Sequence, residues 1–413
     1  MQTALADFIK DTPEGREADR ILRTCVHCGF CTATCPTYQL LGDELDGPRG
    51  RIYLMKQVLE GAPITAKTQL HLDRCLTCRN CESTCPSGVE YGRLVDIGRQ
   101  VVEERVERPL SERVVRMLLK EGLTSPLFAP ALKLGQLVRP LLPEVLRNKV
   151  PAPRHAGGLP TRSHARKVVL LEGCVQPAMT PSINPATARV LDALGIETVR
   201  VARAGCCGAI RHHLNDHDGA LADAKRNIDA WWPHVSGATA AGAEAIVMNA
   251  SGCGAMVKEY GHLLRHDAAY ASKAARISAL TMDLAEFLPP AADALRRALR
   301  ETTPQRVVFH PPCTLQHGQK VRGAVEALLA ALGAEVLPFG ESHLCCGSAG
   351  TYSVLQPELA YPLRDRKHVH LLTPRPELIL SANVGCITHL QSGTEVPVEH
   401  WIEWVDRRLH PRP

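Results

Sequence analysis

Two runs of cysteine decide how the N-terminal part of this 413-residue chain folds. The first run, residues 25–36, reads CVHCGFCTATCP, and the second, residues 75–86, reads CLTCRNCESTCP. In each run three cysteines stand at every third position, and a fourth follows after three intervening residues, directly before a proline. This is the spacing with which cysteine thiolates bind a pair of [4Fe–4S] clusters. The sequence therefore predicts a two-cluster domain at this end of the chain.

The ligands of each cluster follow from the same spacing. Three closely spaced thiolates bind one face of a cubane, and the fourth cysteine, beyond a turn that proline favours, reaches the other cluster. We predict that the two clusters have the following ligands: Cys25, Cys28, Cys31 and Cys85 for the first, and Cys75, Cys78, Cys81 and Cys35 for the second. Zinc is the alternative, but structural zinc sites usually pair two Cys-x-x-Cys hooks and do not need a third evenly spaced cysteine. Arg49 and Arg51 are the cations expected near the clusters.

Bulk composition excludes several other classes of protein. The chain has 48 Lys and Arg against 43 Asp and Glu, without a concentrated basic stripe, so a nucleic-acid partner is not expected. Residues 1–20 are polar and do not resemble a signal peptide, and no apolar run approaches the roughly 20 residues of a membrane span. In a reducing compartment, the sixteen cysteines point to metal binding or redox chemistry and not to disulfides.

An internal repeat follows a Pro/Gly-rich basic linker. The apolar run 168–171 leads to Cys174, and the apolar run 307–309 leads to Cys313. Thirty-one residues then precede the Cys-Cys-Gly of 206–208 in the first copy and of 345–347 in the second. Strand, helix and strand in this order indicate parallel βαβ units. We expect an α-helical ferredoxin-like domain over 1–109, with a helix over 51–59, then a helical segment and linker over 110–166. Two repeated α/β cysteine-rich lobes should follow over 167–290 and 305–405.

The repeat contributes eight further cysteines as a candidate second redox or metal site. They are Cys174, Cys206, Cys207 and Cys253 in the first copy, and Cys313, Cys345, Cys346 and Cys386 in the second. Loops at strand ends are where α/β sheets place their sites, although buried cysteine is also a common core residue. His310 and His389 are neighbours that such a site could recruit, or ordinary polar residues.

Longer stretches of the sequence carry a family resemblance. They are CVHCGFCTATCPTYQLLGDELDGPRGR (25–51), CLTCRNCESTCP (75–86), EGC (172–174), AGCCG (204–208), NIDAWW (227–232), ASGCG (250–254), CTLQH (313–317) and CCGSAGTY (345–352). Together they are similar to the iron–sulfur subunits of bacterial glycolate oxidase. Wider relatives are the small subunit of anaerobic glycerol-3-phosphate dehydrogenase, the lactate-utilisation proteins and a heterodisulfide reductase subunit.

The resemblance implies an oxidoreductase complex in which this chain is not catalytic. Two FAD-binding flavoprotein-type subunits would oxidise glycolate to glyoxylate, with D-lactate as a further substrate. Electrons would pass through the two clusters to a respiratory acceptor, with a quinone as the candidate, in the cytoplasm or on the cytoplasmic face of the inner membrane. The chain shows no G-x-G-x-x-G or phosphate loop, which agrees with a flavin on a partner.

Three alternatives stay open at the level of sequence. The chain could serve a related lactate or glycerol-3-phosphate dehydrogenase, act as a thiol or disulfide reductase through its Cys-Cys-Gly motifs, or be a structural adaptor without electron flow. In the heterodisulfide reductase relatives each repeat ends in Cys-x-x-Cys, whereas Met256 and His389 stand at the last position here. The basic, leucine-rich stretch 111–149 is expected either to pack on the chain's own core or to dock on a partner or a lipid surface.

Overall fold

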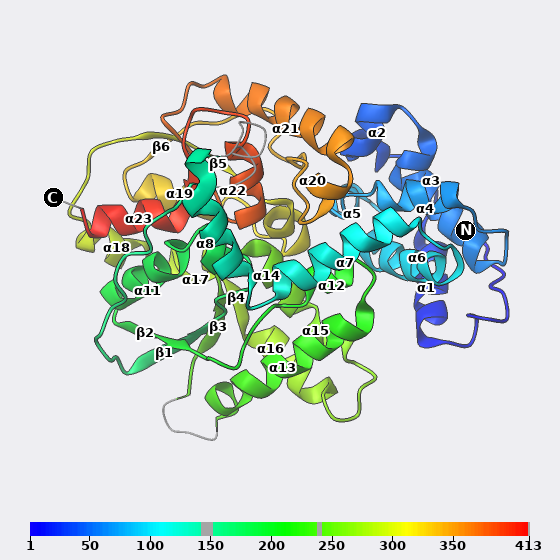
Figure 1. The fold of residues 1–413 in the computed structure, drawn as a ribbon, viewed down its shortest axis with the longest axis horizontal. Coiled ribbons are helices and arrows are strands. Elements are labelled where there is room, and N and C mark those ends of the chain that lie inside the picture. Colours follow the sequence, from blue (N-terminus) through cyan, green and yellow to red (C-terminus); the bar gives the residue numbers. More distant parts are fainter. Residues whose placement is uncertain (142–151, 238–241, 412–413) are drawn as a thin grey trace.

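The structure is a computed structural model that describes residues 1–141, 152–237 and 242–411. A helical N-terminal part, a helical hairpin and two α/β lobes follow one another along the chain (Figure 1). The predicted fold class is confirmed. Residues 142–151, which belong to the predicted helical segment and linker, lie outside the described residues.

The N-terminal part is built from short helices around one apolar core. Its α-helices are α1 Pro13–Thr24, α2 Pro36–Leu41, α3 Pro48–Leu59, α4 Ala66–Asp73, α5 Asn80–Thr84 and α6 Tyr91–Arg105, with 3-10 turns η1 Thr32–Thr34 and η2 Glu44–Asp46. Proline occupies the first position of α1, α2 and α3, where its missing N–H costs no helical hydrogen bond. The helix predicted over 51–59 is confirmed as part of α3. Ile21, Leu22, Met55, Leu59 and Leu94 form the centre of the core.

The first lobe is a parallel sheet with the strand order β2-β1-β3-β4. Its strands are β1 Arg166–Leu170, β2 Ile196–Arg200, β3 Ala245–Met248 and β4 Thr281–Asp283. Its main helices are α11 Ile183–Ala193, α13 His217–Val235, α14 Ser251–Lys258 and α16 Ala271–Leu280; shorter ones are α10 Gln176–Met179, α12 Ala209–His213, α15 Tyr260–Leu263, α17 Leu284–Phe287 and α18 Ala292–Ala298. The central strand β3 is buried on both faces, as parallel strands between helices usually are.

The second lobe repeats this topology. Its strand order is β6-β5-β7-β8, again all parallel, with β5 Arg306–His310, β6 Glu335–Val336, β7 Leu378–Ser381 and β8 Val398–His400. Its helices are α19 Ala324–Ala331, α20 Tyr352–Leu355, α21 Pro357–Leu372, α22 Val384–Gln391 and α23 Trp401–Leu409. The internal repeat predicted from the cysteine spacing is therefore confirmed as two copies of one fold.

The two lobes have one apolar core in common. Helix α11 of the first lobe packs against α23 of the second, where Trp401 and Trp404 are fully buried. The Arg189 guanidinium binds the Asp406 carboxylate across this contact at 2.6 Å. Because the lobes bury apolar residues in common, they form one rigid support for the N-terminal part.

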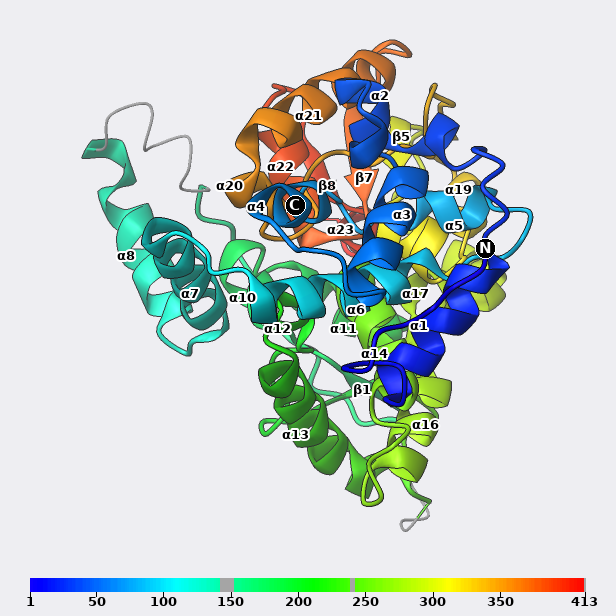
Figure 2. The same cartoon turned by 90° about the vertical axis from the view of Figure 1, so that its right-hand side faces the viewer.

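A helical hairpin, α7 Leu110–Thr124 and α8 Phe128–Val138, lies along one side of the molecule (Figure 2). Within this described hairpin no residue is fully buried, although α7 contacts α12 and α8 contacts α10, so the hairpin rests on the surface of the first lobe and is not part of a core. Pro130 lies in the first turn of α8, where proline is tolerated, and does not interrupt the helix.

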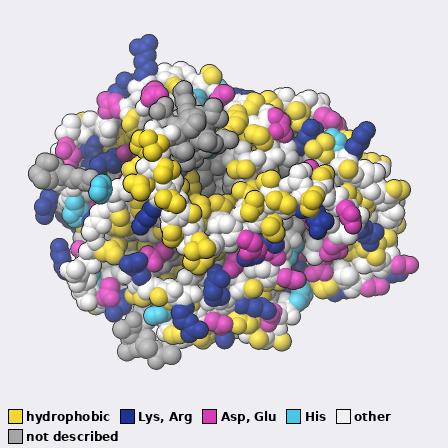
Figure 3. Space-filling view, viewed as in Figure 1, with side chains coloured by type: hydrophobic (Ala, Val, Ile, Leu, Met, Phe, Trp, Pro, Cys, Tyr) yellow, Lys and Arg dark blue, Asp and Glu magenta, His cyan; other side chains and the backbone are white. Residues whose placement is uncertain are grey.

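The hairpin exposes a large apolar surface, which the space-filling view shows over α7 and α8 (Figure 3). Its exposed hydrophobic residues are Leu110, Val114, Val115, Met117, Leu118, Leu127, Leu134, Leu137, Val138 and, just beyond α8, Leu141. None of the helices within the described ranges is long and apolar enough to cross a bilayer.

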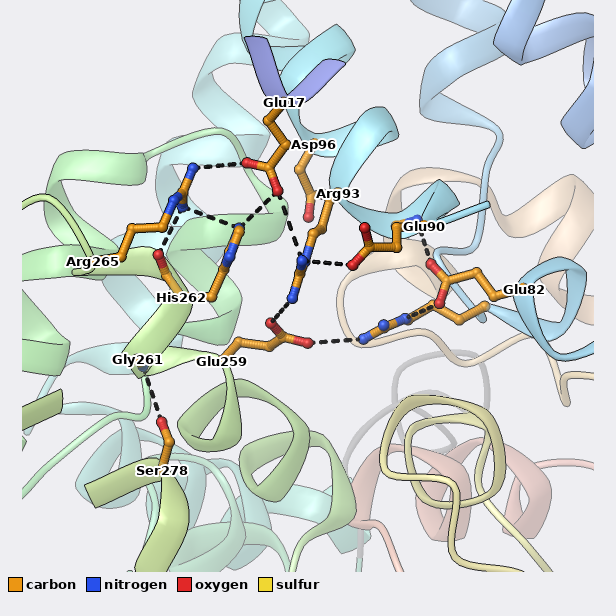
Figure 4. Close-up of polar contacts among 12 residues, drawn as sticks. Glu17, Glu82, Glu90, Arg93, Asp96, Glu259, Gly261, His262, Arg265 and Ser278 are labelled. Carbon is orange, nitrogen blue, oxygen red and sulfur yellow. Dashed lines mark hydrogen bonds and ion pairs between the residues drawn. The ribbon is translucent and has the colours of Figure 1, made fainter. Parts of the chain in front are cut away.

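An ion-pair network attaches the N-terminal part to the first lobe (Figure 4). Glu17 on α1 accepts from Arg265 at 2.7 Å and lies 3.3 Å from the His262 ring nitrogen. Arg93 on α6 lies 3.6 Å from Glu259 of the first lobe and 3.7 Å from Glu17. Burial alone would raise the pKa of Glu17, but the hydrogen bond with His262 and the nearby arginines lower it overall.

We expect the substitution Glu17→Gln to loosen this contact. Losing a charged hydrogen-bond acceptor at a partly buried site costs about 1–3 kcal/mol, or roughly 2–4 °C in melting temperature for each kcal/mol. Because the pKa of Glu17 lies below its usual 4.5, its stabilising charge is present above that pH and is lost only at lower pH. The loss should therefore be the same at neutral pH and at about pH 5.5 in anaerobic thermal unfolding.

Glu107→Gln serves as the matched control, since Glu107 is exposed and lies outside the network. An equal melting temperature for Glu17→Gln and the control would contradict a docking role for the network.

Candidate metal centres

The two cysteine loops adopt the same backbone course. In the first, Cys25 ends α1, His27 and Gly29 take left-handed conformations with φ of 56° and 85°, and Cys35 directly precedes α2. In the second, Thr77 and Arg79, at the corresponding positions, have φ of 51° and 59°, and Cys85 ends α5. Left-handed backbone at non-glycine residues is strained and is held where the surrounding structure requires it. Here it turns successive cysteines of one loop toward the same side.

Four cysteines, termed the outer set, line a hollow near the surface: Cys25, Cys28, Cys31 and Cys85. The hollow has about 430 Å³ of empty space and is also lined by His27, Arg49 and Ile52. Cys28 is exposed, and so are its neighbours Val26 (67%) and Phe30 (61%). The outer set is therefore open to solvent at Cys28, which exposed apolar side chains flank.

The other four, termed the inner set, line a second hollow of about 300 Å³: Cys35, Cys75, Cys78 and Cys81. Three of these four are buried, against one of the outer four. Pro48, Cys81 and Tyr91 line both hollows, so the two sites are immediate neighbours. Each hollow draws thiols from both runs, because Cys35 lies with the second run and Cys85 with the first.

The donor chemistry of the hollows fits iron–sulfur clusters. The inner hollow is lined by four thiols and the outer one by the four of its set and the shared Cys81. Thiols suit iron–sulfur groups or zinc and not hard oxygen-binding cations. Burial and the neighbouring Cys25 raise the pKa of Cys31 to about 11, and burial also raises the pKa values of Cys35 and Cys81. Four thiolates would share such a space only around a cationic group, because otherwise their charges repel at low dielectric.

Arginines lie in the wall of the inner hollow and beside its cysteines, and the sequence predicted only some of them. Arg51, singled out from the sequence, is 1% exposed and lines this hollow, whereas Arg49 lines the outer hollow at the surface. Arg99, whose guanidinium donates to the carbonyl of the inner-set Cys75 at 2.6 Å, was missed. It interrupts the apolar stripe of α6 between Val95, four residues before it, and Val102, three after it. A charge at a buried helical position is the signal that could have found it.

Two side-chain hydroxyls contact inner-set sulfurs. The Tyr91 hydroxyl donates to Cys75 Sγ at 3.6 Å, and the Thr37 hydroxyl lies 3.3 Å from Cys35 Sγ. Thr37 also donates to the Asp46 carbonyl, which fixes its rotamer. These contacts depend on folding, and the sequence does not single them out.

The first-lobe set, Cys174, Cys206, Cys207 and Cys253, gathers beyond the carboxyl ends of β1, β2 and β3. The sulfurs of Cys174 and Cys206 lie 3.4 Å apart, and the Cys207 thiol contacts those of Cys206 and Cys253. The hydrogen bond between the Cys174 and Cys206 thiols raises the pKa of Cys174, which donates, and lowers the pKa of Cys206, which accepts. The structure thus brings all four predicted cysteines of this repeat together.

The second-lobe set, Cys313, Cys345, Cys346 and Cys386, is gathered in the same way and is buried throughout. Cys345 contacts both Cys313 and Cys346, and Cys346 contacts Cys386. This set also joins the inner set, because the Cys313 thiol is within hydrogen-bonding contact of Cys78. His310 and His389 face elsewhere: they are paired with Ser381 and with the Ala360 carbonyl.

The glycine of each Cys-Cys-Gly allows a close approach to a long helix, α13 in the first lobe and α21 in the second. Gly208 and Gly347 have φ of 89° and 91°, and a Cβ would lie 2.9 Å from the Ala220 oxygen and 2.3 Å from the Ala360 oxygen. By these two contacts, α13 of the first lobe and α21 of the second occupy equivalent places in the repeat.

Asn227 of α13 and Lys367 of α21 are at equivalent positions of the repeat, because each lies seven residues beyond the alanine that its glycine approaches. Asn227 donates to the Cys206 carbonyl at 2.8 Å. Burial lowers the pKa of Lys367, which donates to the Glu341 carbonyl. The two thiol sets therefore have different electrostatic surroundings.

Comparison with known proteins agrees with this architecture. The 4Fe-4S dicluster domain family matches residues 21–89, and the cysteine-rich domain family matches residues 168–258 and 307–391. The glycolate oxidase iron–sulfur subunit of Escherichia coli K12 is 54% identical over 99% of both chains. A probable glycolate oxidase iron–sulfur subunit of Bacillus subtilis 168 is 31% identical over 91% of this chain and 89% of its own. Lactate utilization protein A of Geobacillus thermodenitrificans is 27% identical and matches 59% of this chain and 99% of its own. The chain therefore belongs to the family of glycolate oxidase iron–sulfur subunits.

Proposed function

We propose that the chain is the iron–sulfur electron-transfer subunit of a flavin-dependent 2-hydroxy-acid dehydrogenase complex, with glycolate as the substrate of the complex. The observation that carries this proposal is the arrangement of eight thiols around two adjoining hollows with common walls. Full-length similarity to a glycolate oxidase iron–sulfur subunit supports the choice of glycolate over lactate or glycerol 3-phosphate.

The outer set, Cys25, Cys28, Cys31 and Cys85, would hold one [4Fe–4S] cluster, and the inner set, Cys35, Cys75, Cys78 and Cys81, the other. Such clusters supply one-electron transfer. The chain's own residues bind the clusters through thiolates, and the walls of the inner hollow exclude water through Leu76 and Tyr91. The shared wall residues keep the two sets adjacent, which favours rapid transfer between them.

The partners would be two flavoprotein-type chains that carry FAD, because a two-electron substrate requires a flavin to divide the electron pair. The outer set offers the contact surface for electron transfer, since Cys28, Val26 and Phe30 are exposed there. Glycolate would leave as glyoxylate from the partner, with D-lactate as a second substrate. A respiratory acceptor, with a quinone as the candidate, would receive the electrons.

The chain would work in the cytoplasm or bound peripherally to the cytoplasmic face of the inner membrane. The exposed apolar residues of α7 and α8 support peripheral binding, and the exposed Arg113 and Lys133 add positive charge for anionic lipid.

A second candidate function, thiol–disulfide chemistry, is favoured by one contact. Cys313 of the second-lobe set touches Cys78 of the inner set, so electrons could pass from one site to the other. Two electrons and two protons would reduce a disulfide in this set to two thiols. Both C-terminal sets, Cys174, Cys206, Cys207 and Cys253 with Cys313, Cys345, Cys346 and Cys386, thus stand as candidate redox or metal sites.

The crossed ligand assignment can be tested by paired substitutions. We expect anaerobically purified protein to contain about eight iron and eight sulfide per chain, and Cys31→Ser or Cys35→Ser to lose about half of each. If the fourth ligands cross, the double variant Cys31→Ser/Cys35→Ser loses both clusters, since its two sulfurs belong to different hollows.

The control is Cys35→Ser/Cys78→Ser, whose two sulfurs line the same hollow, so it should retain one cluster. Retention of about four iron by Cys31→Ser/Cys35→Ser would contradict crossing, and zinc in place of iron would contradict the proposed function itself.

Replacing Cys207 and Cys346 by Ala separates electron transfer from thiol catalysis. We expect glycolate-dependent dye reduction by the assembled complex to stay within about twofold of the wild type, because a dye accepts electrons from the clusters directly. Cys31→Ser is the control that should abolish it. Loss of dye reduction in the Ala variant, with its cluster spectra intact, would favour the thiol reductase instead.

Peripheral binding predicts that the substitution of Leu134 and Leu137 by Glu lowers co-sedimentation with vesicles of anionic lipid by about tenfold or more. Each leucine side chain that no longer inserts into the lipid removes about 1.5–3 kcal/mol of transfer free energy, and each glutamate adds a negative charge at the interface. Leu159→Glu, at an exposed leucine outside the hairpin, is the control. Equal sedimentation of all three proteins would rule out lipid contact through α8.

A further inference from the structure

We propose that Arg51 and Arg99 give the inner site a higher reduction potential than the outer site, so that electrons received at the surface settle at the inner one. This inference rests on the proposed function, because it assumes a redox group at each hollow. It adds a direction of electron flow and names the residues that set it.

Arg51 places a positive charge in the wall of the inner hollow. Its side chain is 1% exposed, and its guanidinium donates to the His71 carbonyl at 2.7 Å and to the Thr37 hydroxyl at 3.1 Å. It also pairs with Asp46 at 3.3 Å. A second cation, Arg74, binds the other oxygen of Asp46 at 2.9 Å, so this carboxylate is shared between two guanidiniums. The cluster of Arg51, Arg74 and Asp46 therefore keeps a net positive charge beside Cys35 and Cys75.

Arg99 adds a second buried charge beside the Cys75 loop. Its guanidinium donates to the carbonyls of Leu72, at 2.8 Å, and Cys75, at 2.6 Å, and to the Thr77 hydroxyl at 2.8 Å. These partners are neutral, so they satisfy its N–H groups without cancelling its charge. The Asp96 carboxylate, three residues earlier on α6, accepts from His212 at 3.2 Å. Arg99 thus holds the Cys75 turn and directs a positive field toward it.

The outer hollow differs in both charge and exposure. Its arginine, Arg49, has a side chain that is 39% exposed, and its guanidinium forms two hydrogen bonds with Glu44, at 2.7 and 3.1 Å. The Met1 ammonium donates to the Cys25 carbonyl at 3.0 Å but is only partly buried. Water and Glu44 therefore screen the positive charge at this site.

Reduction adds one negative charge to an iron–sulfur group, and nearby cations and hydrogen bonds to its sulfurs favour that state. Burial by itself opposes the added charge. At the inner site the buried guanidiniums counter this penalty, because a charge acts more strongly at low dielectric than in water. The Tyr91 hydroxyl, which donates to Cys75 Sγ, acts in the same direction. At the outer set, the backbone N–H of His27 donates a hydrogen bond to the Cys25 sulfur.

Potentiometric titration followed by electron paramagnetic resonance tests the proposal on single-cluster proteins. Cys31→Ser leaves the inner site loaded and Cys78→Ser leaves the outer one, so each midpoint potential is measured alone. We expect the inner midpoint to be higher. In the Cys31→Ser background, Arg99→Gln should lower the ratio of reduced to oxidised centres about tenfold at a fixed potential, a shift of about 59 mV for one electron. Arg99→Lys, which keeps the charge, should restore most of it.

Two further variants keep the test decisive. Tyr91→Phe removes one hydroxyl without changing the packing and should lower the inner midpoint in the same direction, even if Arg99→Gln fails to load its cluster. Arg49→Gln, made in the Cys78→Ser background, is the matched outer control and should change the outer midpoint much less than Arg99→Gln changes the inner one. An inner midpoint equal to or below the outer one, or unmoved by both Arg99→Gln and Tyr91→Phe, overturns the inference. Absence of iron from either single-cluster protein would instead count against the proposed function.

Discussion

The constraint on which the structure depends is that two loops, about fifty residues apart in sequence, must place their cysteines around common walls. Pro48, Cys81 and Tyr91 border both hollows, and each hollow takes one thiol from the opposite loop. The short helices of the N-terminal part serve this arrangement: α1 ends at one loop, α4 and α5 flank the other, and α3 and α6 supply the buried core between them. Exchange of the fourth cysteine ties the two loops together, so the wall of each hollow is built from both runs.

The lobes and the ion pairs fix how this double site is presented. The network around Glu17 and Arg93 attaches α1 and α6 to the first lobe, while Asn80 donates to the carbonyls of Thr34 and His343 and so joins both loops to the second. Because the lobes share one core through α11 and α23, these contacts hold the inner set against a rigid support. The outer set stays at the surface. Position relative to the lobes, more than a difference in the cysteine motifs, distinguishes the two sites.

Much of this architecture is local or periodic and could therefore be predicted from the sequence. The cysteine spacing indicated the two loops, and the repeated apolar run, helix and Cys-Cys-Gly indicated two parallel βαβ lobes. The features that were missed depend on contacts between distant residues. Arg99 reaches the Cys75 carbonyl from another helix, and Cys313 meets Cys78 across 235 positions of sequence. The open surface of α7 and α8 was also not predictable, because amphipathic spacing identifies an apolar face and not whether that face is covered.

The second lobe lies over one loop of the double site and leaves the other open, which bears on damage by oxygen. Tyr352 of this lobe donates to the Arg74 carbonyl, and Tyr352, Leu359 and Leu363 pack with Leu76 and Cys78 beside the inner hollow. A small oxidant arriving from solvent meets Cys28 before it meets the cysteines beneath this cover. Loss of iron on exposure to air would therefore begin at the surface, with the shielded centre remaining intact for longer and the chain keeping its folded frame while its electron path is cut.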